Sequence, residues 1–598
     1  MAARSHSAFA IDPMLFRSFR VRPYPAGRAE APRPLRVFAR DPTTARLDGA
    51  VVELQVPFEP LKQGPTGCLF RVEDRDDTTG LLFEGVDLED GAILRRRGLD
   101  PSTADPRFGQ QMVYAVCSTI YDRFRRALGR DPSWGFQRHD DEAVLILRPH
   151  AARDQNAWYD PEKGELAFGY YKARRDAAGR NQDESHVFTC LSHDIVVHET
   201  SHALLDGMRQ LFKLETQPDV SAFHEGFSDL VAIFQRFSYR DHVELAIDRG
   251  QGRLDDRLLI DVASQFGQTA AGGGESALRS AIPAGESLET PSAQLLTYDS
   301  ESHDAHSLGS VLVAAVFEAY RTVYRRKTQD LLRLAGTLRP DSGPGYGPLP
   351  EALVRRLARE AGTLAEQFLN IVIRAVDYCP PVDLTFGEYL RAMITADADL
   401  VPDDPWAYRE ALVDAFRRRR VRVDDVPDLS EESLKWHPPD RSLEPVEGLL
   451  FSQRTFDLAP SRAPSEAELN RQARALGRFV CRPDHMWYFG LIEDGKTVLR
   501  GDGVGPPTIQ SLRSVQRVGP DGQLAFDLVA EVVQKRTHAS GVQLFGGATV
   551  IIGPDGRIRY TICKNTGSNR RLDEFLQYRR AAGHSNDSEF FRSLCQRR

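Results

Sequence analysis

The chain is poor in cysteine, with seven in 598 residues and no two of them in a CxxC pair. They are scattered along the sequence, at Cys68, Cys117, Cys190, Cys379, Cys481, Cys563 and Cys595. Small secreted domains that depend on disulfides carry a dense and even set of cysteines, and structural thiolate zinc sites carry closely spaced pairs. The composition argues against both, and we expect reduced, mostly buried thiols.

Long apolar runs and an excess of positive charge are also missing. The longest apolar run, Val311–Phe317, is far too short to span a bilayer, so no membrane span is expected. The first residues lack the charged start, apolar core and cleavage site of a signal peptide, and we expect a cytoplasmic protein. The net charge of −8 predicts no broad basic surface, so nucleic acid is not an expected partner.

The apolar residues, 41% of the chain, are enough for real hydrophobic cores. At roughly 150 residues per domain, the length corresponds to about four units. The pattern changes along the chain from an N-terminal extension with β-hairpins to an α/β segment, a mostly helical segment, a linker rich in Pro, Asp and Ser, and a C-terminal α+β domain. The expected bounds of these parts are 1–104, 105–185, 186–425, 426–465 and 466–598.

Local patterns predict several individual elements. Residues 108–128 predict a helix, because apolar side chains recur there at helical spacing and Gly129 ends the pattern. Strands are expected over 143–147 and 165–170. In the C-terminal part, two Gly-Pro-Asp-Gly turns, the second at 553–556, lie between β-rich runs. They predict a small antiparallel sheet with a helix on each side.

One stretch carries recognisable chemistry: the sequence HExxH at 198–202. On a helix, His198 and His202 are four residues apart and lie on one face, where both imidazoles can reach one zinc ion. Glu199 is rotated about 100° from His198, so its carboxylate can face the open side of the metal. There it can take a proton from an attacking water and pass it to the leaving amine.

A catalytic zinc site needs a third protein ligand besides two histidines. A metzincin would have glycine at 205 and histidine at 208, but this chain has Leu205 and Met208, which excludes that class. Glu225 lies 23 residues beyond His202, which is enough for the helix end, a loop and a return helix. Asp229, four residues further on, shares its face and can accept a hydrogen bond from a ligand imidazole.

This pattern, HETSH followed by Glu-x-x-Ser-Asp, resembles the thermolysin family of gluzincin zinc metallopeptidases. Three other segments are similar to family segments and occur in the family's order: Asn156–Tyr159, Ala277–Ser280 and Asp304–Gly309. The resemblance covers roughly residues 105–425. It implies an α+β fold with two lobes, a mixed β-rich N-terminal lobe and a mostly helical C-terminal lobe, to which a small α+β domain is appended.

The resemblance also implies an activity, a zinc-dependent metalloendopeptidase that hydrolyses peptide bonds through a zinc-activated water. One zinc ion per chain would be held by His198, His202 and Glu225. Glu199 would be the general base and then the general acid. Asp229 would orient a ligand histidine.

A histidine that stabilises the tetrahedral intermediate is implied at His306. His303 competes for this role, and His306 is favoured because a glycine follows it three residues later, as in the family. The carboxylate that orients this imidazole is left open among Asp304, Glu301 and Asp299. Of these, Asp304 is the one expected to support the site from outside the ligand set.

Substrate-binding roles are implied for three more residues. Asn156 and the backbone of Ala157 would hold the peptide or protein substrate as an added strand. Arg279 would contact the substrate carbonyl and support the glutamate ligand. The resemblance has no counterpart for the C-terminal domain, which is left open to binding an unknown partner. An alternative function is therefore a zinc-binding, catalytically weak or inactive scaffold that acts through this domain.

The chain departs from the family in two places. A tyrosine that assists the oxyanion histidine is replaced near Phe212 and Lys213. Asp194 matches a calcium-binding position, but Arg236 stands where another acid would be needed, so calcium is not expected.

Other charged residues fit plainer interpretations. His193 is off the ligand face and is expected at the surface or the edge of the core. His224 points away from the ligand set. The run Arg417–Arg420 is expected to be a solvated helix end.

Overall fold

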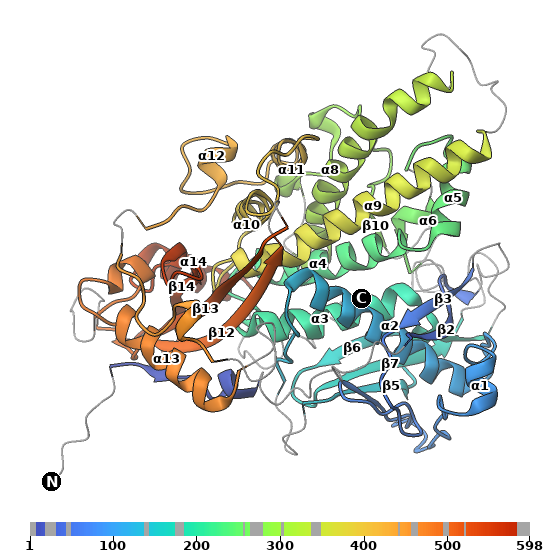
Figure 1. Cartoon of the computed structure of the whole chain (residues 1–598), viewed down its shortest axis with the longest axis horizontal. Helices are drawn as coiled ribbons and strands as arrows, with labels where there is room; N and C mark the ends of the chain where they lie inside the picture. Colours follow the sequence, from blue (N-terminus) through green and yellow to red (C-terminus); the bar gives the residue numbers. More distant parts are fainter. Residues whose placement is uncertain are drawn as a thin grey trace.

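The computed structural model describes most of the chain. It covers residues 8–17, 31–42, 50–136, 143–173, 184–254, 257–263, 279–300, 304–336, 349–439, 443–455, 464–493, 501–518 and 522–582. Within these ranges helices and strands are mixed along the chain, which confirms the α+β class at a coarse level (Figure 1). No helix in this part of the chain is both long and apolar enough to cross a membrane.

The first sheet lies below the central helices in Figure 1. Its strand order is β4 (Phe70–Val72), β5 (Leu145–Ala152), β7 (Glu165–Lys172) and β6 (Ala157–Asp160), and β8 (His186–Phe188) also pairs with β7. Strands β4, β5 and β7 are parallel, whereas β6 runs antiparallel to β7 and ends the order. Strand β5 is buried along nearly its whole length, as expected for a parallel strand covered on both faces. The strand predicted over 143–147 is confirmed as β5, which begins two residues later and extends to Ala152. The strand predicted over 165–170 is confirmed as β7, which extends two residues further.

The first hundred residues contribute to more than one sheet. Strand β4 belongs to the first sheet, and the hairpin of β2 (Arg33–Phe38) and β3 (Val51–Val56) packs on α2 (Pro106–Leu128). Strand β1 (Ala10–Ile11) instead pairs with β12 (Thr508–Val518), near the other end of the chain. The segment 1–104 is therefore divided between parts of the molecule that are distant in sequence.

Helices make up most of the middle of the chain. Those nearest the centre are α3 (His193–Met208), α4 (Pro218–Arg236), α8 (Ala305–Leu334) and α9 (Glu351–Ala375). The others are α1 (Gly91–Arg95), α5 (Arg240–Arg249), α6 (Arg257–Ile260), α10 (Phe386–Ala398), α11 (Tyr408–Arg418) and α12 (Glu431–Leu434). A two-stranded sheet of β9 (Asp261–Val262) and β10 (Arg279–Ser280) lies beside α4.

The predicted helix over 108–128 is confirmed as α2 and begins two residues earlier. Its first turn is capped by the side chain of Asp105, and Gly129 ends it with φ 65°. A Cβ atom on Gly129 would lie 2.0 Å from the carbonyl oxygen of Gln516, so the position needs glycine both for its backbone conformation and for this close approach.

The C-terminal part forms a second sheet, as predicted. Its order is β1-β12-β13-β14-β15, with β13 at Leu524–Thr537, β14 at Gln543–Ile552 and β15 at Ile558–Lys564, and β11 (Gly503–Val504) pairs with β13. Strands β12 to β15 are antiparallel, and α13 (Glu466–Val480) and α14 (Asn569–Ala582) precede and follow them in sequence. The second Gly-Pro-Asp-Gly turn joins β14 to β15, with Gly556 at φ 75°, while most of the first lies outside the described residues.

The expected linker is packed for part of its length. Leu443, Val446 and Leu449 are buried in the same apolar cluster as α13 and one face of the second sheet. Three residues of this polar segment are therefore core residues.

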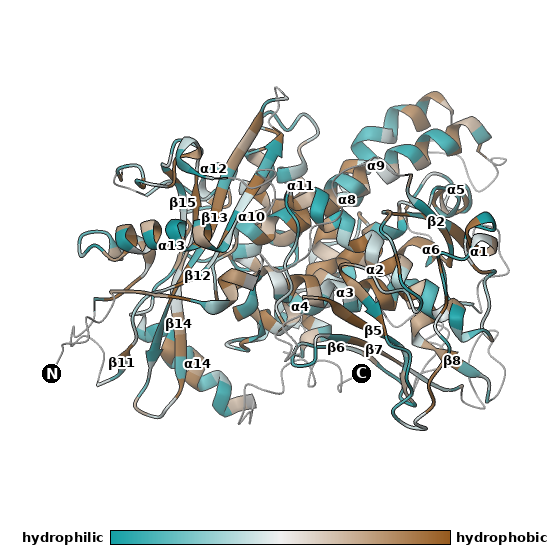
Figure 2. Ribbon diagram, turned by 60° about the horizontal axis from the view of Figure 1, so that its bottom comes forward, coloured by the Kyte–Doolittle hydropathy of each residue, from teal (hydrophilic) through white to brown (hydrophobic). Residues whose placement is uncertain are grey.

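The main apolar core joins the first sheet, the central helices and the other face of the second sheet. Figure 2 shows β5 and β7 largely in brown, the hydrophobic end of its scale, and the central helices with brown and teal residues mixed along them. Four side chains of the second sheet belong to this core: Val515, Val529, Ile551 and Ile562. Helix α3 lies inside it and is buried at every residue, so groups on this helix are held in a dry, packed environment.

Candidate metal centre

Helix α3 presents two histidines on one face. His198 and His202 are one turn apart, and their Nε2 atoms lie 3.0 Å from each other. Both side chains are 2% exposed. Their other ring nitrogens are oriented from α4, because Asp229 Oδ1 lies 2.9 Å from His198 Nδ1 and Ser228 Oγ lies 3.3 Å from His202 Nδ1. Such contacts fix which nitrogen of each ring faces the shared space.

Helix α4 returns alongside α3 and brings Glu225 to the same point. Its Oε2 lies 3.4 Å from His198 Nε2, and its Oε1 lies 3.4 Å from His202 Nε2. Among the described residues, these three form the group that could hold a metal ion. Tetrahedral coordination with bonds of about 2.0–2.1 Å would place neighbouring ligand atoms about 3.4 Å apart. The observed spacings of 3.0 and 3.4 Å fit that geometry.

The protonation preferences of the three residues follow from their contacts. Burial lowers the pKa of His198, but its hydrogen bonds to Asp229 and Glu225 outweigh burial and raise the pKa above its ordinary value. Burial lowers the pKa of His202. Burial acts to raise the pKa of Glu225, yet the charge of His306 and the two ligand imidazoles holds it well below its usual range. An ionised carboxylate beside two imidazoles is the donor set that a divalent metal requires.

Glu199 is fully buried on α3, next to the first histidine. It directly follows His198 in the sequence and lies in the helical turn that separates the two histidines. A carboxylate next to a candidate metal ligand in the sequence is a residue type suited to proton transfer.

His306 lies in the first turn of α8 and reaches the site from a third helix. Its Nδ1 lies 2.9 Å from Glu225 Oε2, and its side chain is 19% exposed, so it stands on the open side of the buried ligands. Two glycines allow this approach: a Cβ on Gly309 would lie 2.9 Å from the Ala222 carbonyl oxygen, and one on Gly226 would lie 2.9 Å from the Gly309 carbonyl oxygen. The close crossing of α4 and α8 therefore places His306 beside Glu225.

The three carboxylates considered for orienting His306 have different positions. Asp304 is the N-cap of α8, and its Oδ1 accepts hydrogen bonds of 3.1 Å from the backbone N–H groups of His306 and Ser307. Asp299 is exposed and lies 4.0 Å from a guanidinium nitrogen of Arg420. Glu301, like the competing His303, lies outside the described residues. Among the described residues, Glu225 is a carboxylate in direct contact with the His306 ring.

The proposed substrate residues precede and begin the edge strand β6. Asn156 Oδ1 accepts a hydrogen bond of 2.9 Å from Ala157 N, and the Asn156 carbonyl oxygen accepts one of 2.8 Å from Gly169 N. On its other edge, β6 pairs with no strand that the structure describes. A hydrogen bond joins this strand to α3: the Tyr159 hydroxyl donates to Asp206 Oδ2 at 2.9 Å.

Arg279 is the residue least well placed by the structure. It begins β10, opposite Val262 of β9, and its side chain lies outside the described part of the chain, as do Ala277 and Leu278. The other two histidines of this region lie in the core. His193 is buried against the Tyr239 hydroxyl, so its expected position at the surface or core edge is wrong, and the His224 ring lies 5.7 Å from that of His202.

A salt bridge takes the place of the calcium position that the resemblance implied. Arg236, on α4, pairs with Asp194 Oδ2 on α3, which also accepts a hydrogen bond of 3.1 Å from Ala263 N. The same guanidinium donates to the Leu258 carbonyl oxygen at 3.0 Å. A fixed cation of the protein thus meets the carboxylate and ties α3, α4 and the β9 segment together.

We expect Arg236→Met to lower the free energy of unfolding by about 3–5 kcal/mol, because it leaves the Asp194 carboxylate buried without its cation. Urea unfolding with and without calcium measures this. The double variant with Asp194→Asn should recover part of the loss. A parent protein that gains stability from calcium would contradict this account.

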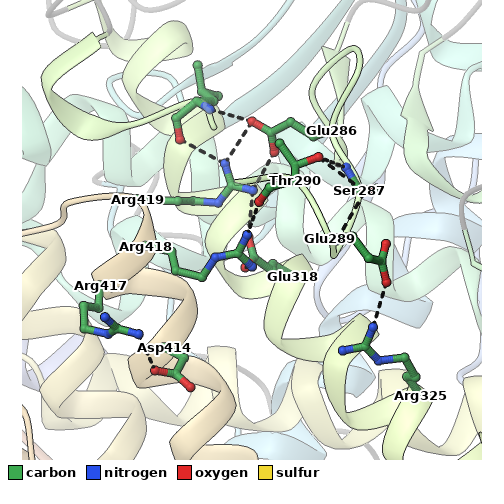
Figure 3. Close-up of polar contacts among 11 residues, drawn as sticks. Glu286, Ser287, Glu289, Thr290, Glu318, Arg325, Asp414, Arg417, Arg418 and Arg419 are labelled. Carbon is green, nitrogen blue, oxygen red and sulfur yellow. Dashed lines mark hydrogen bonds and ion pairs between the residues drawn. The ribbon is translucent and has the colours of Figure 1, made fainter. Parts of the chain in front are cut away.

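The arginine run at the end of α11 differs from expectation. Arg417 is solvated, but Arg418 and Arg419 are not: both pair with Glu318 of α8, and Arg419 also pairs with Glu286 at 2.7 Å (Figure 3). They also donate to backbone carbonyls at 290 and 296. The solvated interpretation is therefore wrong for these two residues. Their pairs join the end of α11 to α8 and to the segment 286–296.

Ser228 and Tyr159 also contact side chains of α3, and the sequence predicts no role for either. Ser228 was visible as part of the Glu-x-x-Ser-Asp motif, whereas nothing in the local pattern linked Tyr159 to Asp206. No family model and no curated protein matches this chain. Its function must therefore be argued from the site.

Proposed function

We propose that the chain is a zinc-dependent metalloendopeptidase with two lobes of the thermolysin-like kind. The observation that carries the proposal is the buried triangle of His198, His202 and Glu225, with Glu199 buried on the same helix as the two histidines. Zinc in that triangle would supply Lewis acidity toward a substrate carbonyl and an attacking water. The remaining steps fall to side chains of the chain itself.

Glu199 accepts the proton of the attacking water and delivers it to the amine that leaves. His306, on the exposed side of the ligands, donates a hydrogen bond to the oxygen that becomes negative on the substrate. Asp229 and Ser228 hold the two histidines in one orientation throughout. The position of the family's tyrosine has no tyrosine here, and His306 carries the stabilisation of this oxygen without it.

The substrate in this proposal is a peptide in extended conformation. It adds to the edge of β6, with Asn156 and the Ala157 backbone as its partners. The Tyr159–Asp206 hydrogen bond keeps that strand at a set distance from the metal helix.

The test is peptide cleavage before and after removal of the metal. We expect a mixed fluorogenic peptide library to be cleaved, cleavage to stop after dialysis against a chelator, and stoichiometric zinc to restore it. Zinc bound at one per chain without chelator-sensitive cleavage would instead support a scaffold that is catalytically inactive. Cleavage that a chelator leaves unchanged would refute the metal-dependent mechanism.

A further inference from the structure

The two metal-binding helices are joined by a short connection, residues 209–217. Helix α3 supplies His198 and His202, and α4 supplies Glu225, so the conformation of this connection sets how the third ligand meets the first two. The connection contains one 3-10 turn, Gln210–Lys213, and backbone hydrogen bonds between residues that are two or three positions apart. Its remaining support comes from outside, and much of it comes from the C-terminal domain.

Arg209, which directly follows α3, is the first point of support. Its side chain is 0% exposed, and its Nη1 lies 3.0 Å from Oε1 of Glu531 on β13, a side chain that is 1% exposed. Arg513 of β12 pairs with the same Glu531 oxygen at 2.7 Å. Arg209 also donates to Thr549 Oγ1 of β14 at 3.0 Å and to the Val376 carbonyl oxygen at 2.6 and 2.9 Å. A guanidinium this deeply buried needs a carboxylate partner, and that partner belongs to the second sheet.

Three further contacts hold the rest of the connection. Gln510 of β12 donates to the side-chain oxygen of Gln210 at 3.1 Å, and the Tyr578 hydroxyl of α14 donates to Glu215 Oε1 at 2.9 Å. Thr216 is held indirectly, through Asp383.

Asp383 lies between the connection and α14. Its Oδ1 accepts from the Thr216 hydroxyl at 2.7 Å, and its Oδ2 lies 2.8 Å from Nε of Arg571 on α14. Asp383 itself has φ 57°, a left-handed conformation that surrounding contacts must maintain. Each end of the 209–217 connection is thus bound to the C-terminal domain through buried or half-buried polar groups.

The apolar contacts agree with the polar ones. One face of the second sheet belongs to the main core, and the opposite face is covered by α13. Figure 1 shows this sheet, in orange to red, beside the end of α3. The domain is therefore packed into the molecule at the place where the metal helix ends.

We propose that the C-terminal domain is a positioning part of the metal centre, which holds the 209–217 connection in the conformation that brings Glu225 to His198 and His202. This inference rests on the metal-binding half of the proposed function and does not depend on peptide hydrolysis. Glu531 is its central positioning residue, since its carboxylate pairs with both Arg209 and Arg513 there.

The test compares two carboxylate-to-amide variants of the full chain. Glu531→Gln removes the charge that Arg209 needs. Asp502→Asn is the matched control, because Asp502, which directly precedes β11, pairs with Arg536 of β13 at 2.7 Å and both side chains are 0% exposed. The described side-chain contacts of this pair do not include residues 209–217. Zinc affinity is measured by competition with a chromophoric chelator, and hydrogen exchange is followed over residues 209–217.

We expect Glu531→Gln to bind zinc about tenfold more weakly than the parent and to exchange faster over the connection, as loss of supporting contacts around a metal site does. Asp502→Asn should keep the parent affinity even if its unfolding temperature falls by a similar amount. Tyr578→Phe, which removes a single hydroxyl, should weaken zinc binding by a smaller factor. It replaces Glu531→Gln as the test variant if Glu531→Gln does not fold.

Equal loss of zinc affinity in Glu531→Gln and Asp502→Asn would overturn the proposal, because it would reflect stability alone. Parent affinity in both Glu531→Gln and Tyr578→Phe would overturn it as well. A parent protein that binds no zinc would refute the proposed function and this inference together, whereas zinc binding without peptidase activity would leave the inference standing.

Discussion

Glu199→Gln should abolish most peptide hydrolysis while leaving the metal in place. The amide has nearly the shape of the carboxylate but cannot accept a proton, so the water is no longer activated and the amine is no longer protonated as it leaves. General acid–base catalysis by one group contributes about 100- to 10,000-fold, and we expect a loss within that range. Cleavage rates on a fluorogenic peptide and zinc content by mass spectrometry are the two measurements.

The two measurements separate an effect on catalysis from an effect on metal binding, because Glu199 is not among the three ligand residues. Zinc content and unfolding temperature of the variant should match those of the parent. Glu199→Asp, which keeps a carboxylate but withdraws it by one methylene, should retain part of the activity. A Glu199→Gln protein that cleaves peptides as fast as the parent would show that the base has been assigned wrongly.

The ligand set could be predicted from sequence because its geometry is local. His198 and His202 share a face of any regular helix, and the apolar pattern around Glu225 predicts a second helix after a short turn. The structure brings these three residues together through two adjacent helices and one short connection. His306 is separated from them by about 80 residues, and its placement depends on the close crossing at Gly226 and Gly309, which no periodic pattern encodes.

Asp304 shows a signal that was present in the sequence and was given a different interpretation. An aspartate that directly precedes a helix, two residues before His306, is a typical N-cap, and Asp304 accepts the backbone hydrogen bonds that define one. The resemblance drew attention to its possible contact with the imidazole ring. Capping still serves the site, because it fixes where α8 begins.

The contacts that could not be predicted join residues far apart in the sequence. Arg419 is paired with Glu318, and the N-terminal strand β1 is paired with β12, almost 500 residues away. From the sequence, an arginine is known to carry a charge, but its partner is not. A strand of two residues is too short to be predicted from its local pattern. Which carboxylate or which strand edge meets them is decided by the packing of the whole chain, and the same is true of Arg209 and Glu531.

Glu225→Ala should remove the metal altogether, the largest effect expected at this site. Two neutral imidazoles on one helix remain, which leaves zinc one protein ligand short of the usual three. Loss of a supporting group around a metal costs about 10- to 100-fold in affinity, and loss of a direct ligand should cost at least the upper end of that range. Asp229→Asn provides the graded comparison, since it removes the group that orients His198 and leaves all three ligands.

Thermal unfolding offers a second measurement of the same change. A ligand that binds only the folded state raises stability in proportion to the logarithm of its concentration over its dissociation constant. Zinc should therefore raise the unfolding temperature of the parent, raise that of Asp229→Asn less at the same concentration, and leave that of Glu225→Ala unchanged. Each protein is compared with its own metal-free form, because alanine also removes the partner of His306 and of the two ligand imidazoles and so changes the stability of the metal-free variant. Zinc stabilisation that survives in Glu225→Ala would mean that the metal binds elsewhere in the chain.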